Sequence, residues 1–271
     1  MRLIRATQIV TMTDMTPKVD CLTVRLATTP EDVTAAQRLR YRVFVQELGG
    51  DGAMVDHDAG IEADRFDPYC DHLLLIDPAR PEGDTVVGVY RLLRSDQAEA
   101  VGGFYTENEY DLTPLKQTGR KLLELGRSCL APDYRGGTGM FRLWNALAAY
   151  VTEHDIEILF GTASFHGTDI DALAPALSVL SSRHLAPPEL RVRAIDGHYQ
   201  PMDLMTVQGQ DRVKAMLNTP ALIKAYLRLG GFVGDGAFVD HDFNTTDICL
   251  ILDTARMNAA QRAIYTRGAA L

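Results

Sequence analysis

Hydrophobic runs of strand length alternate with amphipathic segments of helical length along most of the chain. The pattern predicts strands over residues 22–27, 72–77, 85–94, 121–130, 156–161, 232–238 and 248–252. It predicts helices over residues 30–48, 140–152, 169–182 and 220–229, and a helical tail from residue 255. Strands and helices are interleaved, and the first strands are spaced as antiparallel neighbours. This favours one α/β (α+β) sheet over a doubly wound nucleotide-binding fold.

The clearest helix boundary follows the first predicted strand. Thr29 is a favourable N-cap, Pro30 suits the first helical position and Glu31 complements the helix dipole. Gly49-Gly50 ends this helix, and the Gly- and Asp-rich stretch 49–69 is predicted to be a long loop of the kind that often carries function. We expect a single domain over residues 1–271, with an irregular and helical elaboration at about residues 184–230.

Composition and charge exclude several classes of protein. Of the 271 residues, 46% are hydrophobic and 23% are charged, which suffices for a sizeable core and is unlike a disordered chain. The net charge of −9 argues against a general nucleic-acid binder. No apolar run approaches the roughly 20 residues that a membrane span needs. Residues 1–14 lack the apolar segment and cleavage site of a signal peptide.

The four cysteines, Cys21, Cys70, Cys129 and Cys249, are far apart and form no CxxC motif. This spacing speaks against a disulfide scaffold or a structural zinc site, and we predict no metal. The Asp-His-Asp triplets at residues 56–58 and 240–242 fit turn capping better than metal binding. We expect a cytoplasmic protein. Peripheral contact with the inner face of the cytoplasmic membrane is left open, with the helices after Pro220 as candidates.

A strand, a glycine-rich turn and a helix start follow one another over residues 123–139. Main-chain N–H groups at a helix start are unpaired and carry partial positive charge, and glycines let a ligand approach the backbone. The turn therefore offers a cradle for a phosphate or pyrophosphate, with Arg135 as an added cation. On spacing alone, a plain tight turn is an equally good interpretation. The segment matches neither G-x-G-x-x-G nor a P-loop.

The strand, turn and helix around Arg135-Gly-Gly-Thr-Gly139 resemble the pantetheine-binding core of GNAT-type acyltransferases. The resemblance implies a mixed, mostly antiparallel central sheet flanked by helices, with the amides of the turn holding the phosphate end of a pantetheine carrier. It implies no resident cofactor, because the acyl-phosphopantetheine arrives with the donor. The implied pantetheine-binding residues are Cys129, Leu130, Arg135, Gly136, Gly137, Thr138 and Gly139.

Four further motifs resemble, in their order, those of the acyl-homoserine-lactone synthases, a GNAT branch that takes acyl chains from acyl carrier protein. They are Arg40-Tyr-Arg-Val-Phe44, Glu62-Ala-Asp-Arg-Phe-Asp67, Tyr90-Arg-Leu-Leu93 and Glu124-Leu-Gly-Arg127. Over nearly the whole chain, including residues 221–231 and 236–247, the sequence is more similar to the ornithine N-acyltransferases that make lyso-ornithine lipid. This resemblance implies transfer of a 3-hydroxyacyl chain from acyl carrier protein to the α-amine of L-ornithine.

Attack of an amine on a thioester needs a base, an oxyanion donor and groups that position the amino acid. Glu124 is the first candidate base, and a main-chain N–H beside Cys129–Leu130 is the candidate oxyanion donor. Asp64 and Asp67 are alternative bases or partners for the δ-ammonium of ornithine. Arg40 and Arg91 suit its carboxylate, because a guanidinium is a planar two-pronged donor.

Glu124 and Arg127 lie three residues apart on one predicted strand, so a regular strand would point their side chains to opposite faces. Both can line one site only if a bulge kinks the strand; otherwise one of them is structural. Arg127 is a further candidate for substrate binding, and Phe44 for lining the acyl slot. Each charged candidate taken alone also fits a structural salt bridge.

An acidic carrier protein needs a positive docking surface on this acidic chain. The candidates lie around the glycine-rich turn in sequence and are Arg120, Lys121, Arg135 and Arg142. Two other functions are kept as alternatives: an acyl-homoserine-lactone synthase that uses S-adenosylmethionine, and a non-catalytic acyl- or carrier-binding protein. His166 and Asp171 have the spacing of a glycerolipid acyltransferase motif in surroundings that do not match that family. Ser128 and Ser164 lack a nucleophile elbow.

Overall fold

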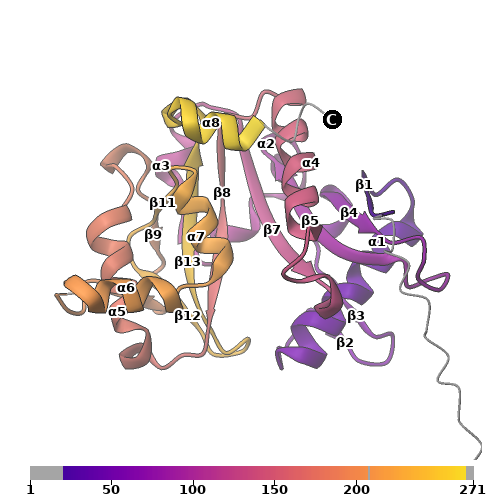
Figure 1. Ribbon diagram of the computed structural model, residues 1–271, viewed down its shortest axis with the longest axis horizontal. Coiled ribbons are helices and arrows are strands. Elements are labelled where there is room, and N and C mark those ends of the chain that lie inside the picture. Colours follow the sequence, from indigo (N-terminus) through magenta and orange to yellow (C-terminus); the bar gives the residue numbers. More distant parts are fainter. Residues whose placement is uncertain (1–20, 207, 267–271) are drawn as a thin grey trace, which may run out of the picture.

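The computed structural model describes residues 21–206 and 208–266, which are built around a nine-stranded sheet (Figure 1). The strand order is β1-β4-β5-β7-β8-β13-β12-β10, and β11 pairs with the same edge of β13 as β12 does. Neighbouring strands are antiparallel except β7 and β8, which are parallel. The strands are β1 Thr23–Leu26, β4 Asp71–Ile76, β5 Val86–Arg94, β7 Leu122–Leu130, β8 Ile158–His166, β10 Tyr199–Gln200, β11 Phe232–Val233, β12 Ala237–Asp240 and β13 Thr245–Asp253.

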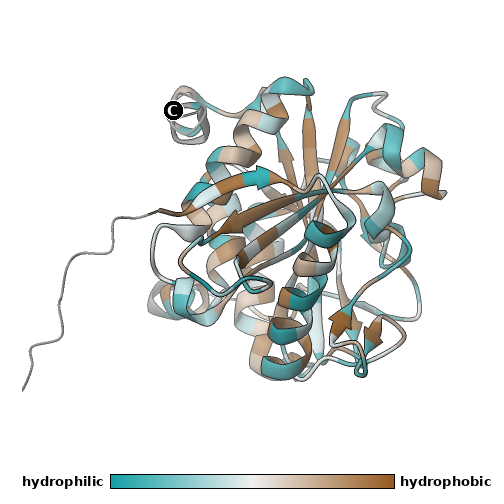
Figure 2. Cartoon of the chain, turned by 90° about the vertical axis from the view of Figure 1, so that its right-hand side faces the viewer, coloured by the Kyte–Doolittle hydropathy of each residue, from teal (hydrophilic) through white to brown (hydrophobic). Residues whose placement is uncertain are grey.

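Helices cover this sheet, whose strands carry most of the hydrophobic positions (Figure 2). The α-helices are α1 Pro30–Arg40, α2 Ser95–Val101, α3 Thr113–Lys116, α4 Gly139–Glu153, α5 Ile170–His184, α6 Gly209–Asn218, α7 Ala221–Arg228 and α8 Ala259–Thr266. One core cluster joins the sheet to α4 and α7 through Leu143, Leu147 and Tyr226. A second cluster joins the sheet to α2 and α3 through Ala98 and Leu115. The mixed, mostly antiparallel sheet flanked by helices confirms the predicted fold class.

The start of α1 follows its sequence signals. The Thr29 side chain accepts a hydrogen bond from the amide of Asp32, and Pro30 occupies the first helical position. After Arg40 the helix continues as a π-helix, Tyr41–Glu47, before Gly49. The predicted helix over 30–48 is therefore confirmed in extent, but its last part has a wider winding that the hydrophobic pattern did not reveal.

Strands β7 and β8 separate halfway along their length. They pair only from Leu122/Ile158 to Glu124/Phe160, and beyond this point each continues without the other (Figure 1). The point of divergence lies at Gly161, where a Cβ atom would lie 2.1 Å from the carbonyl oxygen of Leu125. A side chain at this position would force the strands apart, so glycine permits the close approach from which the opening begins.

Several predicted boundaries are wrong. The stretch 49–69 contains a hairpin of β2 (Val55–Asp56) and β3 (Ile61–Glu62), so it is not a structureless loop. The predicted strand 232–238 is two strands, because the chain turns at residues 234–236, where Gly236 has a φ of 76°. The segment 184–210 holds β9 (Arg193–Ala194), which pairs with β6 (Tyr110–Asp111), and the pattern also missed α2, α3 and α6.

The described residues contain no helix that is long and apolar enough to cross a membrane. The segment 1–14, in which no signal peptide was expected, lies outside the described residues. In α7, one of the helices after Pro220 considered for membrane contact, Ile223 and Tyr226 are buried in the core. Exposed apolar side chains lie instead on α6, where Val213 is 56% and Leu217 is 70% exposed.

Candidate functional site

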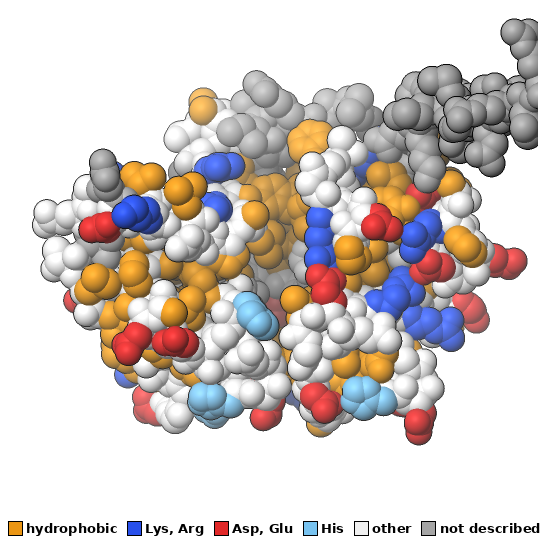
Figure 3. Space-filling model, turned by 60° about the horizontal axis from the view of Figure 1, so that its bottom comes forward, with side chains coloured by type: hydrophobic (Ala, Val, Ile, Leu, Met, Phe, Trp, Pro, Cys, Tyr) orange, Lys and Arg blue, Asp and Glu red, His pale blue; other side chains and the backbone are white. Residues whose placement is uncertain are grey.

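A cavity of about 320 Å³ opens where β7 and β8 diverge. Figure 3 shows a hollow between the two halves of this face of the molecule, with hydrophobic side chains at its back. The polar side chains of its wall include Arg91, Glu109, Glu124, Arg127, Ser128, Thr162, Ser164, His166, Asp240 and Asp247. The apolar side chains include Phe44, Leu48, Tyr90, Leu125, Leu222 and Phe243. Successive residues of a strand point to opposite faces. Glu124 therefore lines the polar part of the cavity on one side of the sheet, and Leu125 lines the apolar part on the other side.

A β-bulge brings Glu124 and Arg127 to the same cavity. The register of β5 and β7 changes between Val89/Cys129 and Arg91/Gly126, so Arg127 and Ser128 together lie opposite Tyr90. Arg127 has a φ of 51°, in the left-handed region that side-chain-bearing residues rarely adopt. Of the two alternatives that the spacing left open, the kinked strand is the one present, and both residues line the cavity.

The carboxylate of Glu124 is buried and anchored by main-chain amides. Its Oε1 accepts a hydrogen bond from the amide of Thr106 at 2.6 Å, and its Oε2 accepts one from the amide of Tyr105 at 2.9 Å. These amides begin the 3₁₀ helix Tyr105–Asn108. Burial raises the pKa of Glu124, although the hydrogen bonds from Thr106 and Tyr105 oppose the rise. A carboxylate with a raised pKa is a stronger base than an exposed one.

Arg127 and Arg91 contribute positive charge to the same wall. The guanidinium of Arg127 lies 4.5 Å from the centre of the Tyr105 ring, and its Nε lies 3.1 Å from Oε1 of Glu62. Nη1 of Arg91 contacts Asp64 at 2.7 Å and Asp67 at 2.9 Å. Both guanidiniums border the cavity and are positioned by carboxylates behind them.

Arg40 and Asp67 lie behind this wall. Arg40 is 0% exposed and donates two hydrogen bonds to the carboxylate of Asp67, at 2.8 and 2.5 Å. Burial opposes ionisation of Asp67, but the hydrogen bond and charge of Arg40 outweigh it and hold the pKa well below its usual range. Arg40, Asp67 and Asp64, predicted to contact the amino acid, are paired with one another and with Arg91 and do not line the cavity. Their contact with a substrate stays a prediction.

Sequence reasoning missed two further carboxylates that line the cavity, Glu109 and Asp247. Glu109 follows the 3₁₀ helix that anchors Glu124, and Asp247 lies on β13 opposite Ser164 of β8. Their side chains are nearly inaccessible, at 6% and 5% exposed. Burial, and for Glu109 also the charge of Asp247, raises the pKa of both groups; that of Asp247 rises to about 6. Asp247 lies inside the segment 236–247, which carried the family resemblance in the sequence, whereas no sequence pattern marked Glu109.

Asp240 has two roles. Its Oδ1 accepts hydrogen bonds from the amides of Asp242 and Phe243, both at 2.9 Å, which confirms the predicted turn capping. The corresponding Asp56 accepts one from Ala59 at 2.9 Å. Asp240 also borders the cavity near Asp247. Among the described residues no group of three or more His, Cys, Asp or Glu side chains is arranged to hold a metal ion.

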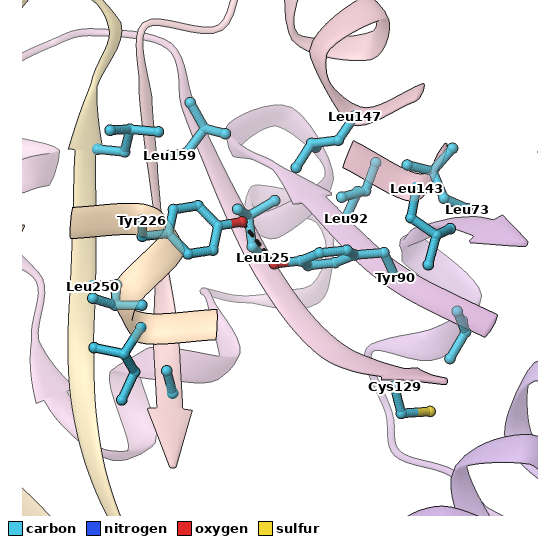
Figure 4. Close-up of a cluster of buried hydrophobic side chains, with 14 of the residues drawn as sticks. Leu73, Tyr90, Leu92, Leu125, Cys129, Leu143, Leu147, Leu159, Tyr226 and Leu250 are labelled. Carbon is cyan, nitrogen blue, oxygen red and sulfur yellow. Dashed lines mark hydrogen bonds between the residues drawn. The ribbon is translucent and has the colours of Figure 1, made fainter. Parts of the chain in front are cut away.

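The apolar wall ends at a pair of tyrosines. Phe44 lines the cavity, as expected for an acyl slot. The hydroxyls of Tyr90 on β5 and Tyr226 on α7 are 2.7 Å apart, and the two rings point toward each other beside Leu125 (Figure 4). A smaller apolar pocket lies next to this pair and shares Tyr90, Leu125 and Leu222 with the main cavity.

The glycine-rich turn leads into the first turn of α4, as predicted. Gly136 has a φ of 73°, and a Cβ atom at Gly136 or Gly137 would meet nothing within 4 Å, so the turn is open on its outer side. Arg135 is held beside it by Glu47, at 2.5 and 2.7 Å. Arg135, Gly136, Gly137, Thr138 and Gly139 are not part of the cavity wall, and neither are Cys129 and Leu130, which are buried in the core.

The four predicted docking cations do not form one patch. Arg120 and Lys121 precede β7, whereas Arg135 and Arg142 follow it, so a strand of roughly 30 Å separates the two pairs. Arg120 is also paired with Asp253 at 2.7 Å. Arg135 and Arg142 alone lie near the glycine-rich turn. The four cations are close in sequence but not in space, because the extended strand β7 lies between the two pairs.

Comparison with known proteins places this site in a family. The profile of the acetyltransferase (GNAT) domain matches residues 39–145. An L-ornithine N(alpha)-acyltransferase of Rhodobacter capsulatus is 58% identical over 90% of this chain and 94% of the relative. One of Brucella abortus is 42% identical over 92% of this chain and 90% of the relative. A solved CoA-dependent acyl-homoserine lactone synthase has the same fold, with a TM-score of 0.50 and 16% identity over 91% of this chain and 89% of that one. The chain is therefore an acyltransferase and belongs to the family of L-ornithine N(alpha)-acyltransferases.

Proposed function

We propose that the protein transfers a 3-hydroxyacyl chain from the thioester of acyl carrier protein to the α-amine of L-ornithine, which yields lyso-ornithine lipid. The observation that carries the proposal is the cavity at the divergence of β7 and β8, which combines a charged wall with an apolar one. A charged amino acid and a fatty chain are the two substrates that such a site can hold together. The names of the relatives support ornithine as the acceptor.

Glu124 acts as the general base in this proposal, directly or through one water. It accepts a proton from the α-ammonium, and the neutral amine attacks the thioester carbonyl. The new N–C bond forms and the C–S bond breaks. The proton that the attacking nitrogen then loses goes to the departing sulfur, so the carrier leaves as a thiol. A main-chain N–H of residues 125–128, where β7 no longer pairs with β8, would stabilise the oxyanion. This segment borders the cavity and includes Ser128, directly beside the Cys129–Leu130 pair next to which the donor was predicted.

Arg127 and Arg91 would hold the carboxylate of the amino acid, since both guanidiniums border the cavity and are oriented by carboxylates behind them. Asp64 then acts by positioning Arg91. Arg40 and Asp67 support the same arrangement from within the core. In this scheme the buried ion pairs preorganise the site, which reduces the cost of ordering it when the substrate arrives.

The phosphate of the carrier's pantetheine arm would bind the open amides of the turn before α4, with Arg135 beside them. The arm would then extend along the diverging strands, so that its thioester reaches the residues between Leu125 and Ser128. The acyl chain would occupy the apolar side near Phe44 and Tyr90. We include peripheral membrane contact in the proposal because the product is an amphiphile and α6 exposes Val213 and Leu217.

The experiment is an acceptor assay with the purified full-length protein. Acyl carrier protein charged with a 3-hydroxyacyl group is mixed with L-ornithine or with S-adenosylmethionine, and release of the carrier thiol is followed. The proposal predicts thiol release that depends on ornithine. Release of methylthioadenosine would support a homoserine-lactone synthase instead. Absence of turnover with both acceptors would support a non-catalytic carrier-binding protein.

A further inference from the structure

We propose that Glu109 and Asp247 form the subsite that binds the side-chain ammonium of the acceptor and so select an amino acid with a second amino group. This inference rests on the proposed function, which assigns an amino-acid acceptor to the cavity. The sequence suggested Asp64 and Asp67 as partners of the δ-ammonium; the present proposal assigns the δ-ammonium to Glu109 and Asp247 instead.

The two carboxylates border the cavity but lack sufficient partners of their own. Oε2 of Glu109 and Oδ1 of Asp247 are buried and have no hydrogen-bond partner among residues 21–206 and 208–266. The remaining contacts are with neutral hydroxyls. Thr162 bonds to Glu109, Ser164 bonds to Asp247, and Thr245 bonds to Oδ2 of Asp247 at 3.1 Å. A buried carboxylate oxygen without a donor is costly, and an ammonium group offers three donors and a compensating charge.

Charge distribution separates this wall from the rest of the cavity. Arg91 and Arg127 have carboxylate partners within 3.1 Å, whereas no arginine or lysine forms a salt bridge with Glu109 or Asp247 in the described part of the chain. Burial raises the pKa of both groups. The charge of Asp247 adds to the rise at Glu109 and that of Asp240 adds to it at Asp247, while the charge of Arg127 opposes both rises. A bound cation would lower both pKa values. The cavity therefore holds two arginines with close carboxylate partners and two buried acids without a salt-bridge partner, on which Arg127 acts only at longer range. A bound ammonium would supply the close cation that these acids lack.

The positions of Glu124 and Glu109 relative to the 3₁₀ helix Tyr105–Asn108 support separate roles for these two acids. The amides that hold Glu124 start the 3₁₀ helix Tyr105–Asn108, and Glu109 directly follows its end. Four residues of 3₁₀ helix advance by about 8 Å. The base and the ammonium subsite are thus held at opposite ends of one rigid segment. An acceptor with two amino groups joined by a short carbon chain can reach both, with the α-amine at Glu124.

Calorimetric binding to the full-length protein tests this subsite without requiring acyl transfer. The two probes are L-ornithine and L-norvaline, which has the same carbon chain without the δ-amine. We expect wild type to bind ornithine at least roughly tenfold more tightly, as a charge-assisted hydrogen bond predicts. Glu109→Gln and Asp247→Asn, made separately and together, should abolish this preference. Asp242→Asn removes an exposed carboxylate from the same hairpin, outside the cavity, and should retain it.

Equal affinity of wild type for the two amino acids would overturn the inference, and so would a preference that survives in the double variant. Thermal unfolding of each variant shows that it is folded, and the two single variants provide a test should the double variant fail to fold. Acyl transfer is measured separately on the same samples. A wild type that discriminates ornithine from norvaline without acylating it would contradict the proposed function and leave the subsite standing.

Discussion

The hydroxyls of Tyr90 on β5 and Tyr226 on α7 share a hydrogen bond of 2.7 Å although the residues are 136 positions apart. The pair lies at the apolar end of the cavity, beside Leu125 of β7 (Figure 4). It ties the half of the sheet that carries β5 to the helix that covers β13. The contact thus fixes the distance across the opening between β7 and β8.

Tyr226→Phe removes one partner of this bond while keeping the ring in the core. We expect a loss of about 1 kcal/mol in unfolding free energy, because the Tyr90 hydroxyl loses a buried partner. Urea denaturation measures the loss. Tyr69→Phe, at an exposed position, serves as the control and should change stability little. An unchanged midpoint for Tyr226→Phe would show that the bond contributes nothing.

Glu124→Gln should lower kcat by about 10²- to 10⁴-fold, the usual range for loss of a general base. The amide keeps the shape of the side chain, and Glu124 lies apart from the glycine-rich turn, so KM for the acyl-carrier donor should change less than about threefold. Steady-state kinetics separate the two parameters. Glu99→Gln on the exposed face of α2 is the matched control. Turnover close to wild type would remove Glu124 from the role of base.

Asp247 should make stability depend on pH. Its pKa of about 6 in the folded protein is raised by burial and by Asp240 from 3.8, with Glu109 and Arg127 also nearby. Since the folded state then binds more protons than the unfolded state, stability falls as pH rises from about 4 to 6. Asp247→Asn should remove up to about 3 kcal/mol of this fall. Urea unfolding at pH 4, 5, 6 and 7 measures it, and parallel curves for both proteins would contradict the assignment.

Arg135→Ala should raise KM for the acyl-carrier donor by roughly three- to tenfold and leave kcat nearly unchanged, because loss of a docking or phosphate-binding cation weakens encounter rather than chemistry. The increase should shrink at high salt, which screens exposed charges. Lys121→Ala removes an exposed cation at the other end of β7 and is the control. If Lys121→Ala raised KM as much as Arg135→Ala did, the carrier would dock elsewhere.

The sequence predicted those parts of the fold that local signals determine. Thr29 and Pro30 set the start of α1, and the glycine-rich turn set the start of α4. The spacing of Glu124 and Arg127 left two possibilities, a bulge or a structural role for one of them, and the bulge is found. Spacing could not show whether a charged residue faces a substrate or another charge. For Arg40 and Asp67 the sequence allowed either substrate binding or a structural salt bridge, and the structure shows them paired in the core.

Glu109 and Asp247 escaped prediction for a different reason. They are 138 positions apart and meet only because Glu109, at the end of the 3₁₀ helix Tyr105–Asn108, lies beside Thr162 of β8 and Asp247 of β13. The short 3₁₀ helix Tyr105–Asn108 has no hydrophobic period that would reveal it, and Asp247 interrupts a strand whose other residues are mostly apolar. Such a pair becomes visible only when strand register and burial are known.

The site of acylation on ornithine tests the central claim most directly. The account places the α-amine at Glu124 and the δ-ammonium at Glu109 and Asp247, so only the α-nitrogen can reach the thioester. Tandem mass spectrometry of the product formed from 3-hydroxyacyl-carrier protein and L-ornithine locates the amide. We predict acylation at the α-nitrogen alone. A product acylated at the δ-nitrogen, or no acylated ornithine, would contradict the account.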